Sequence, residues 1–304
     1  MKPVPVFVLT FLAMIAFASN SLLCRVALKQ TTIDAATFTF DRIFSGAVAL
    51  WIIVLFARRT NVKGASNSLL VARHWALRNG TWLSALALCI YAAAFSFAYI
   101  TLPAGTGALL LFGAVQATMI FWGFRKGEQL DMIQTIGLVT ALAGLVLLLF
   151  PGLSAPAPAS AILMLSAGVA WGIYSLRGRG EKSPVSATAG NFVRAVPFAA
   201  LISVIMIKHH CFDLLGAIYA VISGAITSGL GYVIWYSALR GLKATSAATV
   251  QLSVPVLAAL GGIIFLGEPI TLRLVLASFA ILGGIALVVI EKNHVKAFAH
   301  VSDS

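Results

Sequence analysis

Long apolar runs without charge alternate with short charged loops along the whole chain. The clearest are Gly80–Phe124 and Met132–Leu176, each of which has 45 residues without Asp, Glu, Lys or Arg. A helix needs about 20 apolar residues to cross a bilayer, so each run has room for two helices. The Pro- and Gly-containing stretches Leu102–Gly105 and Pro151–Pro158 predict the turns within them. The pattern therefore predicts a series of membrane-spanning helices.

Six further runs complete this pattern. They are expected at Val4–Leu23, Ala36–Phe56, Ala187–Ile207, Leu214–Leu239, Ala244–Leu266 and Thr271–Ile290. The first run, with Lys2 before it and Ala16–Ala18 near its end, also has features of a cleavable signal peptide. We interpret it as a helix because an internal repeat requires it as a partner. The prediction is an all-α membrane protein with ten spanning helices, each satisfying its own backbone hydrogen bonds.

Two halves of the chain show a weak internal repeat. The rear parts of the two halves align when residue numbers differ by 140, so that Ala98 aligns with Ala238 and Gly144 with Gly284. The N-terminal parts of the two halves align when residue numbers differ by 152. The difference places a 12-residue insertion in the loop Arg58–Asn79. We predict a first repeat over 1–152, a second over 156–292 and a tail at 293–304. Five helices per half is an odd number, so the halves should have inverted topology, as in many transporters.

The basic residues indicate which ends of the helices face the cytoplasm. With a cytoplasmic N-terminus, 15 Lys and Arg fall in inside segments and four in outside segments. Such a bias follows the positive-inside rule and predicts that both termini are cytoplasmic in an inner (plasma) membrane. The net charge of +12 does not indicate nucleic-acid binding, because the charges lie in short loops between apolar spans.

Composition narrows the class of protein further. Hydrophobic residues make up 60% of the chain and charged residues only 10%, with a mean hydropathy of +0.99. A soluble protein has about 25% charged residues. Three cysteines lack metal-ligand spacing, and the sequence has no Walker motif or paired-carboxylate cluster. We therefore expect no enzyme activity, no cofactor and no metal. The expected partners are a small-molecule substrate and the lipid bilayer, and we expect the protein to be a monomer.

Two arginines lie inside predicted spans at positions related by the repeat, Arg42 and Arg194. A charge at membrane depth costs at least a few kcal/mol, so each must face protein, water or the interface. They are either structural residues bound to backbone carbonyls or contacts for a substrate carboxylate or gate. Asp41 cannot pair with Arg42 on the same helix, because adjacent positions point apart. It is a local partner or cap, or a proton site.

Aromatic and polar side chains within the spans are the candidates for a substrate cavity. Ser228, Tyr232, Trp235, Tyr236 and Leu239 fall on one face of the eighth helix. The full set of candidate substrate-binding residues is Trp171, Tyr91, Asn20, Gln116, Tyr232, Trp235, Tyr236 and Gln251. Aromatic bodies with polar tips suit an amphipathic solute, although ordinary packing or an interfacial belt also explains them. Tyr99, near the end of its helix, fits the belt.

Pro255 is expected in the middle of the ninth helix, where it removes one backbone hydrogen bond and leaves a carbonyl available. It is a candidate hinge, together with Arg42 and Arg194 as candidate gates, or else a tolerated kink. Small residues four apart, Gly137 with Ala141 and Ala280 with Gly284, predict close helix packing.

Several of these stretches resemble the EamA-type group of the drug/metabolite transporter superfamily, which includes bacterial amino-acid exporters. The segments that carry the resemblance are Thr37–Leu50, Ala98–Leu110, Ala167–Tyr174 and Tyr236–Pro269. The first half departs from the family pattern, because Val115-Gln116 stands where a proline is expected.

The resemblance implies export of small metabolites by alternating access through a central cavity between the halves. Helices one, three, four, six, eight and nine would line the cavity, and Trp171 matches a tryptophan associated with it. Glu128 and Glu268 would cap turns. We therefore expect an exporter of aromatic, hydrophobic or other amino acids. The alternatives are a drug exporter, which predicts an acidic cavity, and, from other classes, a non-transporting membrane partner or a membrane enzyme.

Overall fold

The computed structural model describes residues 5–59, 79–127, 131–150, 155–178, 183–239 and 250–302, together with residues 181 and 242. Every regular element within these ranges is helical. In chain order they are α1 (Val6–Gln30), α2 (Ala35–Arg59), α4 (Trp82–Tyr99), α5 (Ala104–Arg125), α6 (Met132–Leu149), α7 (Pro158–Gly178), α8 (Pro184–Ile205), the 3₁₀ turn η1 (Ile207–His209), α9 (Leu214–Ile222), the π-helix η2 (Ser223–Leu230), α10 (Gly231–Leu239), α12 (Ser253–Leu266) and α13 (Leu272–Ser302).

Helix ends follow the polar and glycine residues that punctuate the apolar runs. The Asp131 side chain accepts from the Gln134 backbone N–H, and the Gln134 side chain accepts in return from the Asp131 N–H, which forms a capping box before α6. Thr81 caps α4 by accepting from the Ser84 N–H. Gly267 ends α12 with φ of +61°, a left-handed conformation that glycine adopts without strain. These caps supply partners for backbone groups that lipid cannot satisfy.

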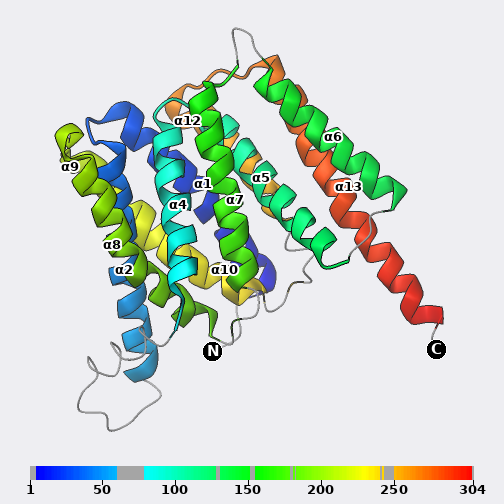
Figure 1. Cartoon of the computed structure of the whole chain (residues 1–304), viewed down its shortest axis with the longest axis horizontal. Coiled ribbons are helices and arrows are strands. Elements are labelled where there is room, and N and C mark those ends of the chain that lie inside the picture. The colour runs from blue at the N-terminus through cyan, green and yellow to red at the C-terminus, as the bar shows by residue number, and fades with distance from the viewer. Residues whose placement is uncertain are drawn as a thin grey trace.

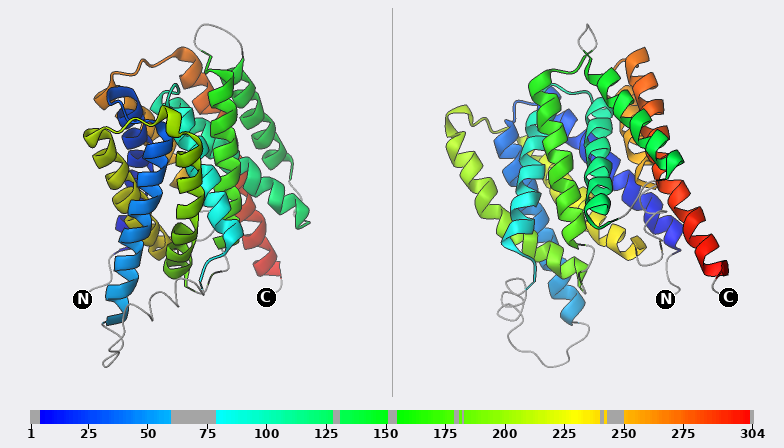
Figure 2. Two further views of the ribbon diagram at one scale, coloured as in Figure 1. Left: turned by 60° about the vertical axis from the view of Figure 1, so that its left-hand side comes forward. Right: turned by 45° about the vertical axis from the view of Figure 1, so that its right-hand side comes forward.

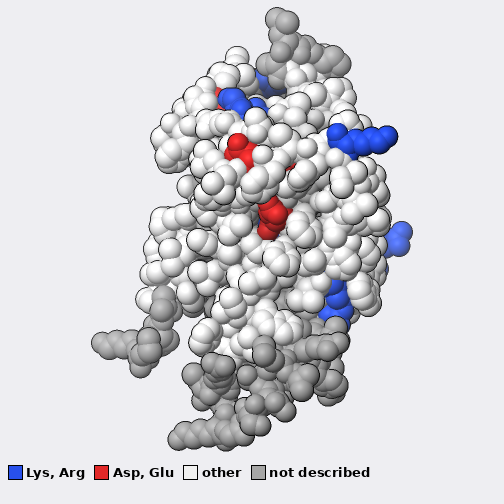
Figure 3. All heavy atoms as spheres, turned by 90° about the vertical axis from the view of Figure 1, so that its left-hand side faces the viewer, with Lys and Arg blue, Asp and Glu red and all other residues white. Residues whose placement is uncertain are grey.

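Eight helical stretches of the described chain are long and apolar enough to span a membrane. One of them, Leu214–Ala238, runs continuously through α9, η2 and α10. Two shorter apolar helices, Ser253–Leu266 and Leu272–Leu287, follow. On the face shown in Figure 3, uncharged side chains cover most of the described surface. The protein is therefore an all-helical, multi-pass membrane protein, with eight full-length spans where ten were expected.

The helices form a bundle with a separate pair at one edge (Figure 1). That pair is α6 and α13, whose closest approach is through small residues: a β-carbon at Gly284 would collide with the Gly137 carbonyl, and Gly144 lies against Ala280. This confirms the predicted close packing. In the rest of the bundle α2 packs on α8, α7 on α4 and α5, and α1 on α10 and α12. The N- and C-termini lie at the same end of the bundle (Figure 2).

Some elements differ from the expected helices, and some residues with an expected role lie beyond the described chain. Pro255 is not in the middle of a helix: it is the third residue of α12, and the preceding helical residues 250 and 251 are separated from α12 by a turn at Leu252. The π-helix η2 was not expected from the sequence. The predicted tail is helical as far as Ser302. Residues 60–78 and 244–249, and Glu128, lie outside the described part of the chain.

Candidate functional site

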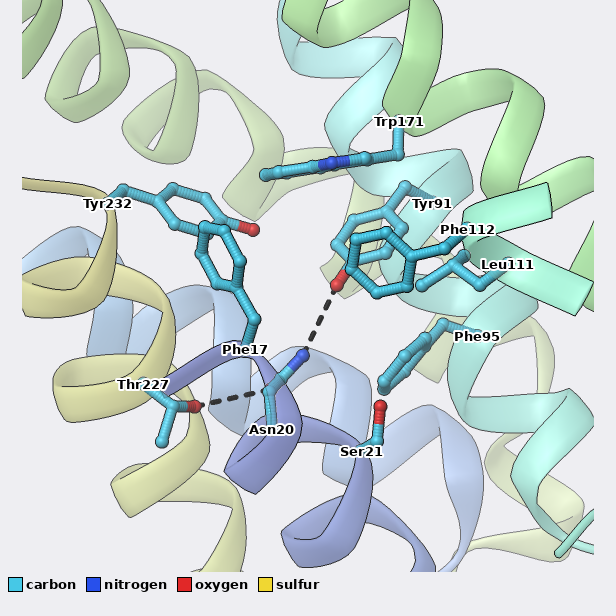
Figure 4. A pocket seen from close by; sticks show the side chains of 10 residues that line it. All are labelled: Phe17, Asn20, Ser21, Tyr91, Phe95, Leu111, Phe112, Trp171, Thr227 and Tyr232. Carbon is cyan, nitrogen blue, oxygen red and sulfur yellow. Dashed lines mark hydrogen bonds between the residues drawn. The ribbon is translucent and has the colours of Figure 1, made fainter. Parts of the chain in front are cut away.

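A cavity lies in the interior of the bundle, where α1, α4, α5, α7, η2 and α10 meet. Its empty volume is about 340 Å³, most of it in crevices that admit little more than water. The side chains around it are uncharged (Figure 4). They are Phe17, Asn20, Ser21, Tyr91, Phe95, Leu111, Phe112, Trp171, Thr227 and Tyr232.

Trp171 is the centre of the aromatic part of the wall. Its ring centroid lies 4.9 Å from that of Tyr91 and 5.0 Å from that of Tyr232. Phe17 approaches Trp171 edge-on at 6.4 Å. Such tilted and edge-to-face contacts stabilise aromatic pairs by about 1 kcal/mol each. Four helices therefore hold one aromatic cluster, and the Tyr232 hydroxyl points into the space beside it (Figure 4).

A polar cluster covers the opposite wall and is centred on Asn20 of α1. The Asn20 Nδ2 group donates to the Tyr91 hydroxyl at 3.2 Å. The Asn20 Oδ1 atom accepts from the hydroxyls of Ser223 at 2.6 Å and Thr227 at 3.3 Å. Both hydroxyls belong to the π-helix η2, a kind of segment that often occurs at functional sites. Residues four apart share a face of a helix, so both hydroxyls reach the same amide.

Arg42 of α2 lies directly behind this wall and is 1% exposed. Its Nη2 donates to the Tyr91 hydroxyl at 2.9 Å and its Nε to the Ser228 hydroxyl at 3.3 Å. The guanidinium carbon lies 5.1 Å from the Tyr91 ring centroid and 4.9 Å from that of Phe95, within cation–π range. The Nη1 group is buried and has no hydrogen-bond partner. The guanidinium is thus held by neutral groups only.

A second cavity, with an empty volume of about 280 Å³, lies nearer the end of the bundle that carries the termini. Tyr174, Arg177, Asn191 and Tyr236 are among its lining residues. Arg177 donates to the Ser84 hydroxyl at 3.0 Å. The Tyr174 ring stacks on Trp171 with centroids 5.5 Å apart. Because Trp171 lines the first cavity and Tyr174 the second, their stacked rings separate the two.

The far end of the bundle, away from the termini, is closed by what we call the latch, made of Arg25, Glu268, the Ala104 N–H and the Tyr99 and Ile100 carbonyls. Arg25 Nε lies 3.2 Å from Glu268 Oε1, and the two side chains are 10% and 7% exposed. Arg25 Nη1 donates to both carbonyls at 2.8 Å. Glu268 Oε2 accepts from the Ala104 N–H, the first of α5, at 2.7 Å. Glu268 therefore caps a neighbouring helix and not its own turn.

Beyond the helices, Asp34 joins two loops at this far end. Its carboxylate accepts from the Thr37 N–H at 3.0 Å, from the Thr37 hydroxyl at 2.5 Å and from the Cys211 N–H at 3.0 Å. Burial alone would raise the pKa of Asp34, but these hydrogen bonds outweigh it and hold the pKa below its ordinary value. The ionised carboxylate is therefore the form that the fold favours.

Only some of the predicted cavity residues meet at the first cavity. Trp171, Tyr91, Asn20 and Tyr232 line it, and Tyr236 lines the second. Three others line neither of these two cavities: Trp235 packs against Phe17, Gln251 precedes α12, and Gln116 is buried in α5. Arg194 is bound to the carbonyls of Asn79 and Gly190.

The list of candidate substrate-binding residues drawn from the sequence left out six residues that complete the wall. They are Phe17, Ser21, Phe95, Leu111, Phe112 and Thr227. The described part of the ninth helix, α12, contributes no side chain to this cavity, although the ninth helix was expected to line it. Tyr99 is fully buried and donates to the Ala104 carbonyl at 3.2 Å, so its assignment to an interfacial belt was wrong. Among the described residues, no group of three His, Cys, Asp or Glu could hold a metal ion.

Comparison with known proteins decides the family. The profile of the EamA-like transporter family matches residues 158–290. The threonine/homoserine exporter RhtA of Escherichia coli (strain K12) is 30% identical over 207 residues, which cover 64% of this chain and 67% of that protein. The chain belongs to the EamA-like transporter family. The expected membership of the drug/metabolite transporter superfamily is thereby confirmed.

Further relatives and a solved structure are similar to this chain over much of its length. The uncharacterized protein PA1977 of Pseudomonas aeruginosa is 52% identical over 280 residues, covering 92% of this chain and 93% of that protein. RhtA of Salmonella typhimurium (strain LT2) is 32% identical over 190 residues, covering 60% of this chain and 61% of that protein. A crystal structure with 20% identity superposes with a TM-score of 0.62 over 93% of this chain and 96% of that one. The last comparison shows a shared fold only.

Proposed function

We propose that this EamA-family transporter exports amino acids, or similar small amphipathic metabolites, across the inner membrane by alternating access. The observation that carries the proposal is the central cavity, whose lining combines six aromatic side chains with amide and hydroxyl groups and no formal charge. Such a lining suits a small solute with both apolar and polar parts. The named relatives that export threonine and homoserine support the same class.

The arrangement of helices supports two inverted repeats of five, over 1–152 and 156–292. The pairs in contact are related by exchange of the halves: α4 on α7 corresponds to α1 on α10, and α5 on α7 to α1 on α12. Pairs that would map onto themselves, α2 on α8 and α6 on α13, are also in contact. We assign both termini to the cytoplasm from the positive-inside bias, which places the latch on the outer side.

Alternating access requires that the cavity be closed at one or both ends in any one state. The narrow cavity, the latch at the far end and the Trp171–Tyr174 stack toward the termini support an occluded conformation. The break before Pro255 is a candidate hinge for the α12 movement, and Arg194, held by two carbonyls, a candidate anchor of α8.

Counterflow in liposomes tests the function. Purified protein is reconstituted with internal threonine, homoserine or an aromatic amino acid, and uptake of the radiolabelled solute is compared with that of empty vesicles. We expect counterflow of at least one amino acid. Lack of flux for every amino acid, with protein shown to be folded by its thermal transition, would overturn the proposal.

Side-specific labelling of single cysteines tests the topology. Cysteines introduced at Lys126 and Lys182 should react from the same side of the membrane, and one introduced at Arg273 from the other. Labelling of Lys126 and Lys182 positions from opposite sides would contradict the inverted repeat.

A further inference from the structure

The hydrogen bonds around the central cavity leave Tyr91 with a free donor and no free acceptor for a solute. The Tyr91 oxygen already accepts from Arg42 and from Asn20, so both of its lone pairs are used. Its own proton has no acceptor among the described residues and is available to a group in the cavity. Asn20 Oδ1 accepts from the Ser223 hydroxyl at 2.6 Å, whereas the single Thr227 hydroxyl proton is shared with the nearer Ser223 carbonyl at 2.8 Å.

Arg42 adds a charge and a further donor behind the same wall. No carboxylate of the described residues lies within 4.0 Å of its guanidinium. Its Nη1 is a buried donor without a partner. It is unfavourable to bury a cation without a counter-ion or a donor without an acceptor. A ligand carboxylate would supply both the negative charge and the acceptor that Arg42 lacks. The neutral Tyr91, Phe95 and Ser228 contacts lower that cost and supply no negative charge.

We propose that the cavity selects solutes that carry a carboxylate, and that Tyr91 and Arg42 form the subsite that binds it. The Tyr91 hydroxyl donates to one carboxylate oxygen. Rotation of the Tyr91 side chain lets Arg42 Nη1 donate to the second carboxylate oxygen. The aromatic cluster of Trp171, Phe17 and Tyr232 then receives the apolar part of the solute. This inference rests on the proposed function and narrows its substrate class.

The subsite also explains why a cationic drug is a poor occupant. The ten lining residues include no acid, and the nearest buried charge is positive. An organic cation would lose its hydration and meet a guanidinium, whereas a carboxylate gains a charge-assisted hydrogen bond. The cavity thus favours zwitterions and monocarboxylates over amines.

Binding to the full-length protein in detergent tests the subsite independently of transport. The probes are threonine, its amino alcohol threoninol, which lacks the carboxylate, and 3-hydroxybutyrate, which lacks the amino group. Affinity is measured by the shift of the thermal unfolding midpoint with probe concentration. We expect threonine and 3-hydroxybutyrate to bind at least about tenfold more tightly than threoninol, because hydrogen bonds to a charged group contribute about 1.5–3 kcal/mol.

Two variants identify the residues. Arg42→Met and Tyr91→Phe should each bring the threonine-to-threoninol ratio close to one, and Arg42→Lys should retain part of it. Tyr91→Phe keeps the ring and its packing, so it is informative even where Arg42→Met does not fold. Arg273→Gln, which removes a half-buried arginine on α13 that donates to the Phe150 carbonyl, is the matched control and should keep the full ratio.

The outcomes separate this inference from the proposed function. Equal binding of threoninol and threonine by the natural protein would overturn the carboxylate subsite, even with amino-acid counterflow present. A ratio unchanged in Arg42→Met and Tyr91→Phe would overturn the assignment of these residues. Carboxylate binding that depends on Arg42, without flux of any amino acid, would uphold the subsite and refute amino-acid export.

Discussion

Replacing Glu268 with Gln tests whether the latch holds the far end of the bundle closed. The change keeps the size of the side chain and removes its charge. The carboxylate now meets Arg25 Nε at 3.2 Å and the Ala104 N–H at 2.7 Å, and both charged side chains are about nine-tenths buried. The variant therefore leaves Arg25 buried without a counter-ion.

The size of the effect follows from what Arg25 retains. Removing one partner of a buried ion pair is destabilising by about 3–5 kcal/mol. Arg25 keeps two backbone carbonyls at 2.8 Å, which solvate its guanidinium, so we expect about 3 kcal/mol, the lower end of that range. At about 2 °C per kcal/mol for a chain of this size, the unfolding midpoint should fall by about 6 °C.

Cys24 provides a second readout, because it is fully buried and precedes Arg25 on α1. In a protein that keeps Cys24 alone, a maleimide should label it faster when the latch opens. If all of the 3 kcal/mol favours opening, the open population rises by about 100-fold. Asp131→Ala is the control: it removes the side-chain cap of α6 and should leave Cys24 protected.

The reasoning would be refuted by a Glu268→Gln protein with an unchanged midpoint and an unchanged rate of Cys24 labelling. A falling midpoint with Cys24 still protected would make the pair a purely structural contact. Arg25→Met added to Glu268→Gln should recover part of the lost stability, since it removes the uncompensated charge.

Three further predictions concern the cavity, the helix packing and the far-end loop. Trp171→Ala removes the centre of the aromatic cluster and should reduce counterflow at least about tenfold, with Trp122→Ala, a 48% exposed position, as the control. Gly224→Ala places a β-carbon against the Arg42 carbonyl oxygen and should lower stability by about 1–3 kcal/mol, measured as the thermal midpoint. Asp34 has a lowered pKa, so its ionised form stabilises the fold above its unfolded pKa of about 3.9, and this contribution is lost as pH falls through the lower folded value. The stability difference between Asp34→Asn and the natural protein should therefore be largest near pH 6 and should shrink as the pH falls below about 3.9.

The helices could be predicted from the sequence because each is bounded by residues that act locally. Pro103 and Gly267 end or begin helices through their own backbone preferences, and Asp131 forms its capping box within three residues. The small residues of α6 and α13 recur at a helical spacing, which indicates a packed face before its partner is known. Local chemistry therefore accounts for the positions of the helices and for one helix pair.

The cavity depends on contacts between segments far apart in the sequence, and the sequence predicts it less well. Ser223 and Thr227 reach Asn20 because η2 packs against α1, and no local pattern in this chain indicates that neighbour. Tyr99 has the position of a belt residue, but tertiary packing buries it under Ala104. Trp235 shares a helical face with Tyr232, yet only Tyr232 reaches the cavity wall. Which of several aromatic residues faces the solute is a property of the assembled bundle.

The closures at the two ends of the cavity differ in strength, and this difference favours one direction of opening. At the far end a solute must break the Arg25–Glu268 pair, whose charged side chains are buried and also hydrogen-bond to backbone groups. Toward the termini it must separate Trp171 from Tyr174, an aromatic contact that contributes about 1 kcal/mol, and then enters the second cavity. We therefore predict that the easier opening is toward the termini. With the termini in the cytoplasm, as the charge bias predicts, this conformation would take up its solute from the cytoplasm, which the proposed export requires.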